Sequence, residues 1–142
     1  MSELVQVADA VVAALNAGPL SQPLTAQRTF QPYFDLKDLK TLQVSVVPRK
    51  LTETKAARSL TAFEYEIDVG IQKRLAKVED SEIDPLVLLA TEIATLFRTQ
   101  RLAEYPAALW VKTETVALPA SEHLLELRQF TGVLTLTFRV IR

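Results

Sequence analysis

Two long segments in which apolar and polar residues alternate constrain this fold most, because a period of two fits a strand with one buried face and one wet face. The first segment covers residues 63–72, and the second, residues 130–141, closes the chain. Strands of this kind predict an antiparallel sheet covered on one side only. The apolar positions of the first segment are Phe63, Tyr65, Ile67, Val69 and Ile71.

Three further segments are predicted as strands. Residues 41–47 alternate in the same way and end at Pro48, and residues 109–118 are rich in β-branched side chains. Residues 26–34 form a weaker candidate, in which Pro32 favours a position at the edge of the sheet.

Two segments have the three- and four-residue spacing of amphipathic helices. The first covers residues 2–17 and stops before Gly18 and Pro19. For the second, Asp84 is predicted as the N-cap and Pro85 as the first helical residue. Residues 121–128 fit either a helical turn or the start of the last strand. The apolar stripe of the second helix consists of Leu86, Leu89, Ala90, Ile93, Leu96 and Phe97.

The order of these elements predicts an α+β fold. Helices and strands do not alternate as they do in parallel-sheet proteins, so the simplest arrangement is an antiparallel or mixed β-sheet of four to five strands with the two main helices packed on one face. A chain of 142 residues has the usual size of one domain. We therefore expect a single domain over residues 1–142.

Charge and composition exclude several classes of partner. The formal net charge of −1 provides no overall field for binding nucleic acid or an anionic membrane. The absence of cysteine excludes disulfides, thiolate nucleophiles and cysteine-based metal sites. The first residues lack the basic flank of a secretory signal, and no apolar run approaches the length needed to span a bilayer. These features predict a soluble protein.

No pattern in the sequence indicates catalysis, a metal site or a cofactor. His123 is the only histidine, and it is expected to be partly exposed beside Glu122. Glu64, Glu66 and Asp68 share one face of a strand, where solvation or pairing with lysines on neighbouring strands is a simpler explanation than paired catalytic carboxylates. The three glycines are isolated, so a phosphate-binding loop cannot form.

Residues 49–62 connect two predicted strands and are predicted to form a long loop, well beyond the length of an ordinary hairpin turn. This segment contains Arg49, Lys50, Lys55 and Arg58 against the single acid Glu53. Three interpretations stay open: a solvated loop, a protein contact, and a nucleic-acid contact, the last disfavoured because no aromatic residue is present to stack on bases. These four basic residues are the candidate interface.

Several segments together resemble a known family. An amphipathic first helix is followed by a strand that ends in Val46, Val47 and Pro48 and by a long loop. The later motifs lie at residues 63–72, 84–86, 92–93, 122–126 and 130–138. Together they are similar to the small tail-terminator or tail-completion proteins of tailed bacteriophages and prophages, including lambda-type terminators. The likeness extends over nearly the whole chain.

The resemblance implies a structural protein of the virion without enzymatic activity. Such a subunit assembles as a ring, commonly of six, on the head-proximal end of the tail tube, where it ends tube polymerisation and forms the surface for head joining. The implied partners are other copies of the chain, the tail tube protein and a head-completion protein, with no membrane and no specific nucleic acid. The implied location is the host cytoplasm during assembly and then the virion tail.

Three alternatives to a tail terminator stay open. One is another head–tail connector or neck protein, which also forms rings from subunits of similar size. Another is a small α+β ligand-binding protein or enzyme, although the buried face of residues 63–72 offers only the Tyr65 hydroxyl as a polar group. The third, a nucleic-acid-binding module, is disfavoured by the near-neutral charge.

Overall fold

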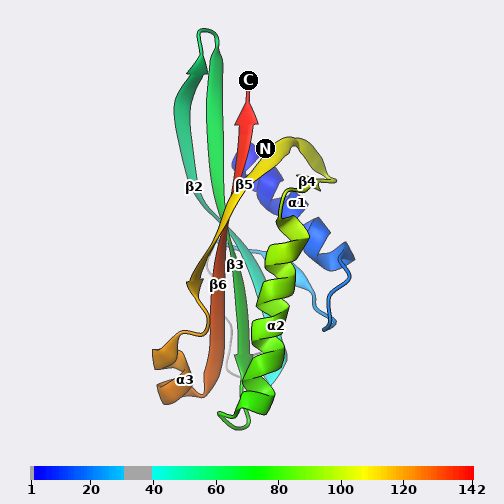
Figure 1. Ribbon diagram of the computed structural model, residues 1–142, viewed down its shortest axis with the longest axis vertical. Helices are drawn as coiled ribbons and strands as arrows, with labels where there is room; N and C mark the ends of the chain where they lie inside the picture. Colours follow the sequence, from blue (N-terminus) through cyan, green and yellow to red (C-terminus); the bar gives the residue numbers. More distant parts are fainter. Residues whose placement is uncertain (1, 31–39) are drawn as a thin grey trace.

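A computed structural model describes residues 2–30 and 40–142. The described chain forms three helices and six strands (Figure 1). The predicted strand at residues 26–34 is shorter than expected where it is described, and its second half lies outside the described residues. The elements are α1 (Glu3–Ala17), β1 (Ala26–Arg28), β2 (Gln43–Ala57), β3 (Leu60–Arg74), α2 (Asp80–Phe97), β4 (Arg101–Leu102), β5 (Tyr105–Ala117), α3 (Ser121–Leu127) and β6 (Gln129–Ile141).

The strands form one mixed sheet in the order β1-β2-β3-β6-β5-β4. β1 is parallel to β2, and all other neighbours are antiparallel. The predicted α+β class and mixed sheet are confirmed, and β1 lies at an edge as Pro32 suggested. The expected number of strands was too low, because β4 has only two residues and leaves no alternation to detect.

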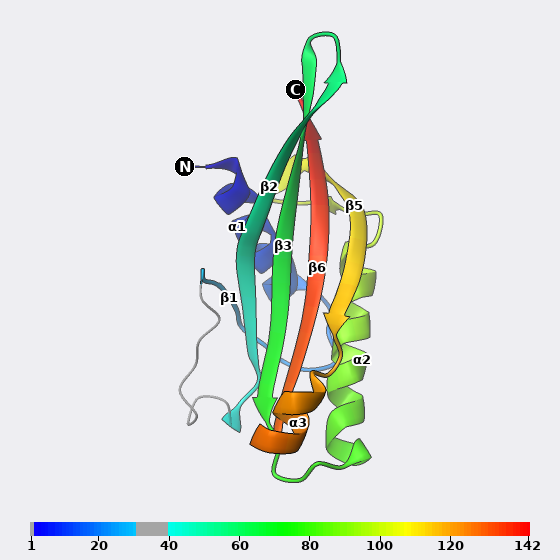
Figure 2. The same ribbon diagram turned by 90° about the vertical axis from the view of Figure 1, so that its left-hand side faces the viewer.

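Both long helices cover the same face of the sheet, as predicted, and α3 lies at one end of the opposite face (Figures 1 and 2). The covered face carries the apolar half of each alternating strand, and the other face carries the polar half. We call the second surface the open face. The side chains that form the centre of the core include Val11, Val46, Ile67, Val69, Leu89, Ile93, Leu136 and Phe138.

The first helix begins and ends close to where the sequence predicts. Ser2 is its N-cap, and the Ser2 Oγ accepts a hydrogen bond from the Val5 amide at 3.3 Å. Val7, Val11 and Leu15 recur at four-residue intervals and are buried against the sheet. Burial of this stripe, rather than helix propensity, holds the element in place.

The second helix begins earlier than predicted. It starts at Asp80 with Glu79 as N-cap, so Pro85 lies inside the helix rather than at its first position. A proline there removes one helical hydrogen bond to the carbonyl of Ser81, and both residues are exposed, so water can reach that carbonyl. The extra turn lets Ile83 join the apolar stripe and places Asp80 and Glu82 at the positive end of the helix dipole.

The predicted loop at residues 49–62 is wrong. β2 and β3 pair almost to their ends and are joined by Arg58 and Ser59 alone, so this segment is a β-hairpin that projects beyond the body (Figures 1 and 2). We call residues 49–62 the arm. Residues 49–60 are exposed throughout, so no hydrophobic alternation marked the strands in the sequence.

Candidate interaction surface

The four candidate residues all lie on the arm, but in two different environments. At its base, the Arg49 guanidinium lies 3.4 Å from the Asp68 carboxylate, and the Lys50 ammonium lies 3.7 Å from that of Glu66. A register shift between Pro48 and Lys50 marks a bulge at Arg49. The charges of Arg49 and Lys50 are therefore partly neutralised within the subunit.

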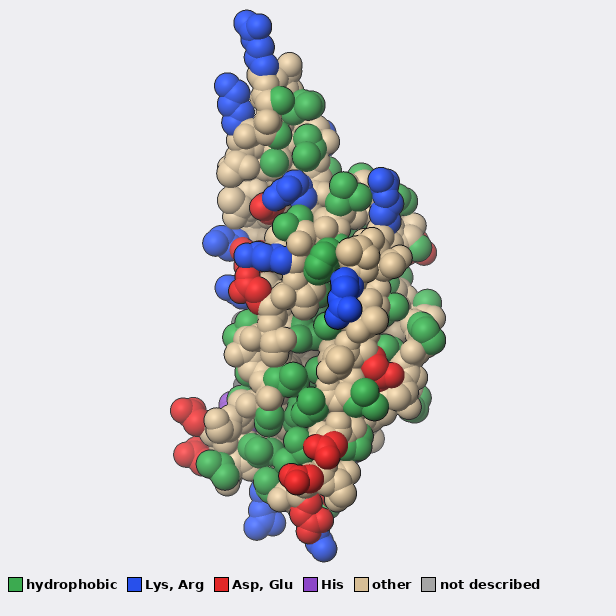
Figure 3. Space-filling view, in the orientation of Figure 1, with side chains coloured by type: hydrophobic (Ala, Val, Ile, Leu, Met, Phe, Trp, Pro, Cys, Tyr) green, Lys and Arg blue, Asp and Glu red, His purple; other side chains and the backbone are tan. Residues whose placement is uncertain are grey.

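The tip of the arm is different. Neither Lys55 nor Arg58 forms an ion pair or side-chain hydrogen bond with any residue in the described parts of the chain. The tip also exposes apolar surface, since Leu60 keeps 45% of its accessible area. Figure 3 shows basic side chains at the projecting end of the molecule and acidic ones, together with a few basic ones, at the opposite end. Two cations and exposed apolar surface remain available to a partner.

The open face carries rows of opposite charges. In β3, the Glu64 carboxylate lies 3.3 Å from Arg139 of β6, and Asp68 accepts a hydrogen bond from the Thr135 hydroxyl at 2.7 Å. The three acids of this strand are thus paired with basic side chains of neighbouring strands. The expected pairing with lysine holds for Glu66, whereas Glu64 and Asp68 pair with arginines. Within residues 2–30 and 40–142, no group of three acids or histidines is placed to hold a metal ion.

Farther along this face, Lys112 and Glu114 of β5 form an ion pair at 2.7 Å. The hydrogen bond from Lys112 lowers the pKa of the Glu114 carboxyl, and the same bond raises the pKa of the Lys112 ammonium. Both side chains are more than half exposed, so the pair contributes little to stability. Its importance is that it places a charged pair on the part of β5 that lies beyond the short pairing with β4.

His123 lies in α3 and contacts the start of β6. Its Nδ1 lies 2.7 Å from the Thr131 hydroxyl, and the ring is half-buried. This contact links α3 to the open face. The half-buried ring agrees with the prediction that His123 is partly exposed.

A cluster around Glu3 was missed by the sequence analysis. The carboxylate of Glu3 accepts hydrogen bonds from the hydroxyls of Tyr65 and Tyr105, and the Arg142 guanidinium lies 3.1 Å from it. The guanidinium also lies over the Phe63 ring, 4.3 Å from its centroid. These residues come from both ends and the middle of the chain, so no sequence spacing could have indicated the cluster.

The Glu3 cluster shifts several pKa values. Burial alone would raise the pKa of Glu3, but hydrogen bonds from Tyr105, Tyr65 and Arg142 outweigh it and lower that pKa below 4.5. The pKa of Tyr65 is raised by burial and by its bond to Glu3, and the pKa of Tyr105 is raised chiefly by its bond to Glu3. The tyrosines therefore stay neutral and the carboxylate charged, which suits a structural tie between α1, the sheet and the C-terminus.

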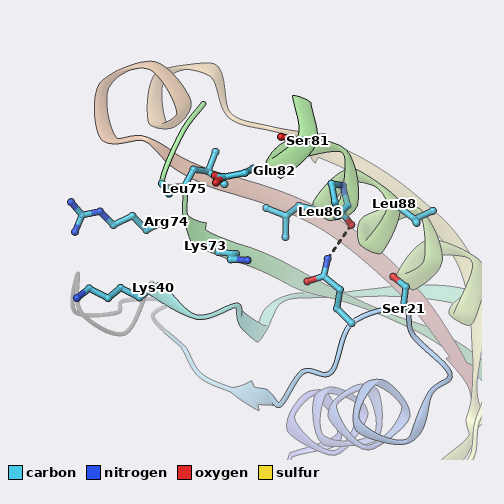
Figure 4. Close-up of a pocket in the computed structure, with 12 residues that line it drawn as sticks. Ser21, Lys40, Lys73, Arg74, Leu75, Ser81, Glu82, Leu86 and Leu88 are labelled. Carbon is cyan, nitrogen blue, oxygen red and sulfur yellow. Dashed lines mark hydrogen bonds between the residues drawn. The ribbon is translucent and has the colours of Figure 1, made fainter. Parts of the chain in front are cut away.

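A shallow hollow of about 530 Å³ lies between the start of α2, the end of β3 and residues 21–22 (Figure 4). The Gln22 side chain spans it and donates a hydrogen bond to the Pro85 carbonyl at 3.1 Å. Lys40 and Arg74 point away from the apolar side chains Leu86 and Leu88 (Figure 4). A small-ligand site requires polar groups that converge on one point, and the polar groups of this hollow do not converge.

In the described parts of the chain, none of the helices combines the length and hydropathy needed to cross a bilayer.

Comparisons with known proteins give a likeness of fold. No family model matches the chain, and no curated protein matches it in sequence. Among solved structures, the chain is similar to the PVC sheath/tube terminator of an extracellular contractile injection system, determined by cryo-EM in the extended state, with 17% identity and a TM-score of 0.50. The match covers 100% of this chain and 57% of that chain, so this protein spans a little over half of its neighbour's length. At 17% identity, the likeness shows a shared fold alone.

Proposed function

We propose that this protein is a tail terminator, a non-enzymatic structural subunit that assembles as a ring on the end of a phage-type tail tube. The ring, of six copies in the simplest case, ends tube polymerisation and offers its outer surface to a head-completion protein. The observation that carries the proposal is that the whole chain shares its fold with a sheath/tube terminator. The protein would act in the host cytoplasm during assembly and remain in the virion tail.

The arm supports a role in assembly. Residues 49–60 are exposed and make almost no contribution to the core, yet β2 and β3 stay paired up to Ala57 and Leu60, with register shifts at Arg49 and between Lys55 and Ala57. A projecting ribbon with unpaired cations is a costly feature for a monomer, because ordering it loses conformational entropy without burying apolar surface. A partner that covers the arm would recover that cost, and we assign the tip residues Lys55 and Arg58 to contact with the tube or with another subunit.

The chemistry of the described residues is consistent with a structural role. Tyr65 and Tyr105, whose pKa values are raised, both donate hydrogen bonds to Glu3, whose pKa is lowered, and these bonds tie three distant segments together. Acids of the open face are paired with basic side chains rather than gathered around a cavity. These contacts stabilise the subunit and its open face, so a partner protein would recognise this surface by its shape and charge.

The test is a tube-capping assay. The tube protein encoded in the same genome would be polymerised with and without this protein, and tube length and end structure measured by negative-stain electron microscopy. We expect shorter tubes with extra density at one end. Unchanged lengths and bare ends would contradict the proposal, and binding to a head-completion protein without binding to the tube would indicate a connector instead.

In the same assay, the double variant Lys55→Glu/Arg58→Glu tests whether the tip of the arm makes the contact. It reverses the two cations that have no partner within the described chain and should fold normally. Arg49 and Lys50 are poorer choices, because their reversal would place new acids beside Asp68 and Glu66. Full capping by the Lys55/Arg58 variant would remove the tip from the proposed contact.

A further inference from the structure

The sheet ends in an open strand on the side of β5. β4 pairs with β5 only between Tyr105 and Leu109, and no strand of the described chain pairs with residues 110–117 on the side away from β6. This stretch contains no proline and is rich in valine and threonine. A long unprotected edge invites pairing with another strand, so proteins usually cover or blunt such edges.

The opposite side of the sheet is open along the arm. β1 pairs only with residues 44–46 of β2, and beyond them the outer edge of β2 has no partner strand in the described chain. The Thr29 amide donates a hydrogen bond to the Val46 carbonyl, so the backbone N–H and C=O groups of Val46 point away from β3. The ladder alternates and the bulge adds one residue, so the backbone groups of Leu51, Glu53 and Lys55 also face outward.

In the described chain, the arm has one side that a further strand could join. On the β3 side, β6 already pairs as far as the chain end, where Thr61 and Arg142 exchange backbone hydrogen bonds at 2.8 and 3.0 Å. The arm is therefore three-stranded up to the pair of Lys55 with Thr61, and only its tip is a two-stranded ribbon. A strand added to the arm must lie along the outer edge of β2, which is exposed for pairing.

We infer that β5 of one copy pairs antiparallel with the β2 arm of the next copy, so that the sheets of neighbouring subunits become continuous. The inference rests on the ring of the proposed function and specifies its contact. Strands β2, β3, β6 and β5 alternate in direction, so β5 runs opposite to β2. Copies related by rotation about an axis from which the strands are tilted, as in a closed barrel, then meet in the antiparallel sense and with a stagger. Each copy uses two different edges once, which is a heterologous contact able to close a ring.

Charges on the open face select the register of this pairing. Lys50 and Lys112 lie at the same height across one subunit, through the pairs Lys50 with Glu66, Glu66 with Thr137 and Thr137 with Lys112. An unstaggered contact would place Lys112 beside the neighbour's Lys50. A stagger of two residues keeps each side chain on its own face and brings Glu114 opposite that Lys50 instead. It also places Lys112 opposite the neighbour's Thr52.

The staggered register agrees with the backbone as well. The backbone N–H and C=O groups of Arg142 point toward β3, so those of Thr137, an odd number of residues away, point toward β5. Lys112 is the partner of Thr137, so its backbone groups point toward β6. Thr113 therefore faces the open edge. In the staggered register Thr113 meets the neighbour's Leu51, whose backbone groups also face outward, so both can form ladder hydrogen bonds.

The pairing can be tested by cross-linking, because the natural chain has no cysteine. Thr52→Cys and Lys112→Cys would be made as separate single variants, mixed at a concentration where light scattering shows oligomers, and treated with a short bismaleimide. We expect a covalent dimer from the mixture and none from either variant alone. A variant carrying both substitutions should give a ladder on a denaturing gel that ends at the copy number of the ring. Leu88→Cys, exposed on α2 and outside both strands, is the control for random collisions.

The outcomes separate this inference from the proposed function. Oligomers that give no dimer in the mixture, or a dimer from Thr52→Cys alone, would overturn the pairing of β5 with β2 and leave the ring in place. A protein that stays monomeric both alone and with the tube would overturn the ring itself, and the pairing with it.

A second pair of variants tests the backbone contact without a cross-linker. Glu53→Pro removes an outward N–H that the subunit does not use, and Glu53→Ala keeps it. Prolines are tolerated at such edge positions. We expect Glu53→Pro to lose the oligomer with an unchanged circular dichroism spectrum and melting temperature, and Glu53→Ala to keep it. The same oligomer from folded Glu53→Pro would contradict the pairing.

Discussion

The two long strands β2 and β3 run through two regions that differ in everything except hydrogen bonding. In the body, their alternate residues are buried against α1 and α2, as Val46 and Ile67 show with no exposed area. In the arm, the same ladder continues while residues 49–60 are all exposed. Ladder pairing is thus separable from burial, and only burial stabilises the fold to a large extent. The arm is preserved by pairing alone, which leaves its surfaces available for contacts with other chains.

The largest expected effect comes from the core of the body. Phe138 is fully buried and meets Phe97 edge to face, with the ring centroids 6.2 Å apart. Phe138→Ala should reduce the free energy of unfolding by about 3–5 kcal/mol, through lost burial and the cavity left behind. Urea denaturation measures it. Leu60→Ala at the arm tip is the matched comparison and should change stability by less than about 0.5 kcal/mol; equal losses would refute the contrast between the regions.

The Glu3 cluster, where the arm base meets α1 and the C-terminus, should give the next largest effect. Glu3→Gln keeps the shape but loses the charge that binds Tyr65, Tyr105 and Arg142, at a cost of about 1–3 kcal/mol at neutral pH. Thermal and urea unfolding of both proteins measure the difference. A variant as stable as the natural protein at pH 7 would show that the carboxylate does not hold the cluster together.

The same pair of proteins gives a prediction for pH. The pKa of Glu3 is lower in the folded protein than its ordinary value of 4.5. The unfolded chain therefore binds the proton first, and the stability due to Glu3 is fully present above about pH 4.5 and is lost as the pH falls through the lower folded-state pKa. The difference in the free energy of unfolding between the natural protein and Glu3→Gln should become smaller as the pH falls through that range, and a pH series of urea unfolding curves measures it. A constant difference would contradict the assignment.

A smaller effect should separate the base of the arm from its tip. Arg49→Glu/Lys50→Glu places acids beside Asp68 and Glu66 and should cost about 1 kcal/mol, because the pairs are exposed. High salt should reduce this loss. Lys55→Glu/Arg58→Glu should leave stability unchanged within about 0.5 kcal/mol. Melting curves at two salt concentrations measure both, and a salt-sensitive loss from the tip variant would mean that the tip has a partner within the subunit.

Sequence patterns predicted the parts of the fold whose side chains are buried. The first helix, the stripe of α2 and the alternating strands β3 and β6 all appear where hydrophobic periodicity placed them, because burial of one face imposes that period. The start of α2 was misplaced because the signal of Asp84 and Pro85 was local, whereas burial of Ile83 extended the helix upstream. The arm was mistaken for a loop because a strand exposed on both faces has no apolar period.

The candidate surface divides in the same way. The sequence alone determined which residues could contribute charge to it, Arg49, Lys50, Lys55 and Arg58, and their role as an interface stays a prediction. Only the tertiary structure decided that two of them are paired with acids of β3, and that the other two lie at a projecting tip without a side-chain partner among the described residues. It also brought together Glu3, Tyr65, Tyr105 and Arg142 and left the edges of β2 and β5 open. Sequence periodicity reports what each segment buries, whereas contacts between distant segments and the edges they leave unpaired depend on how the whole sheet is assembled.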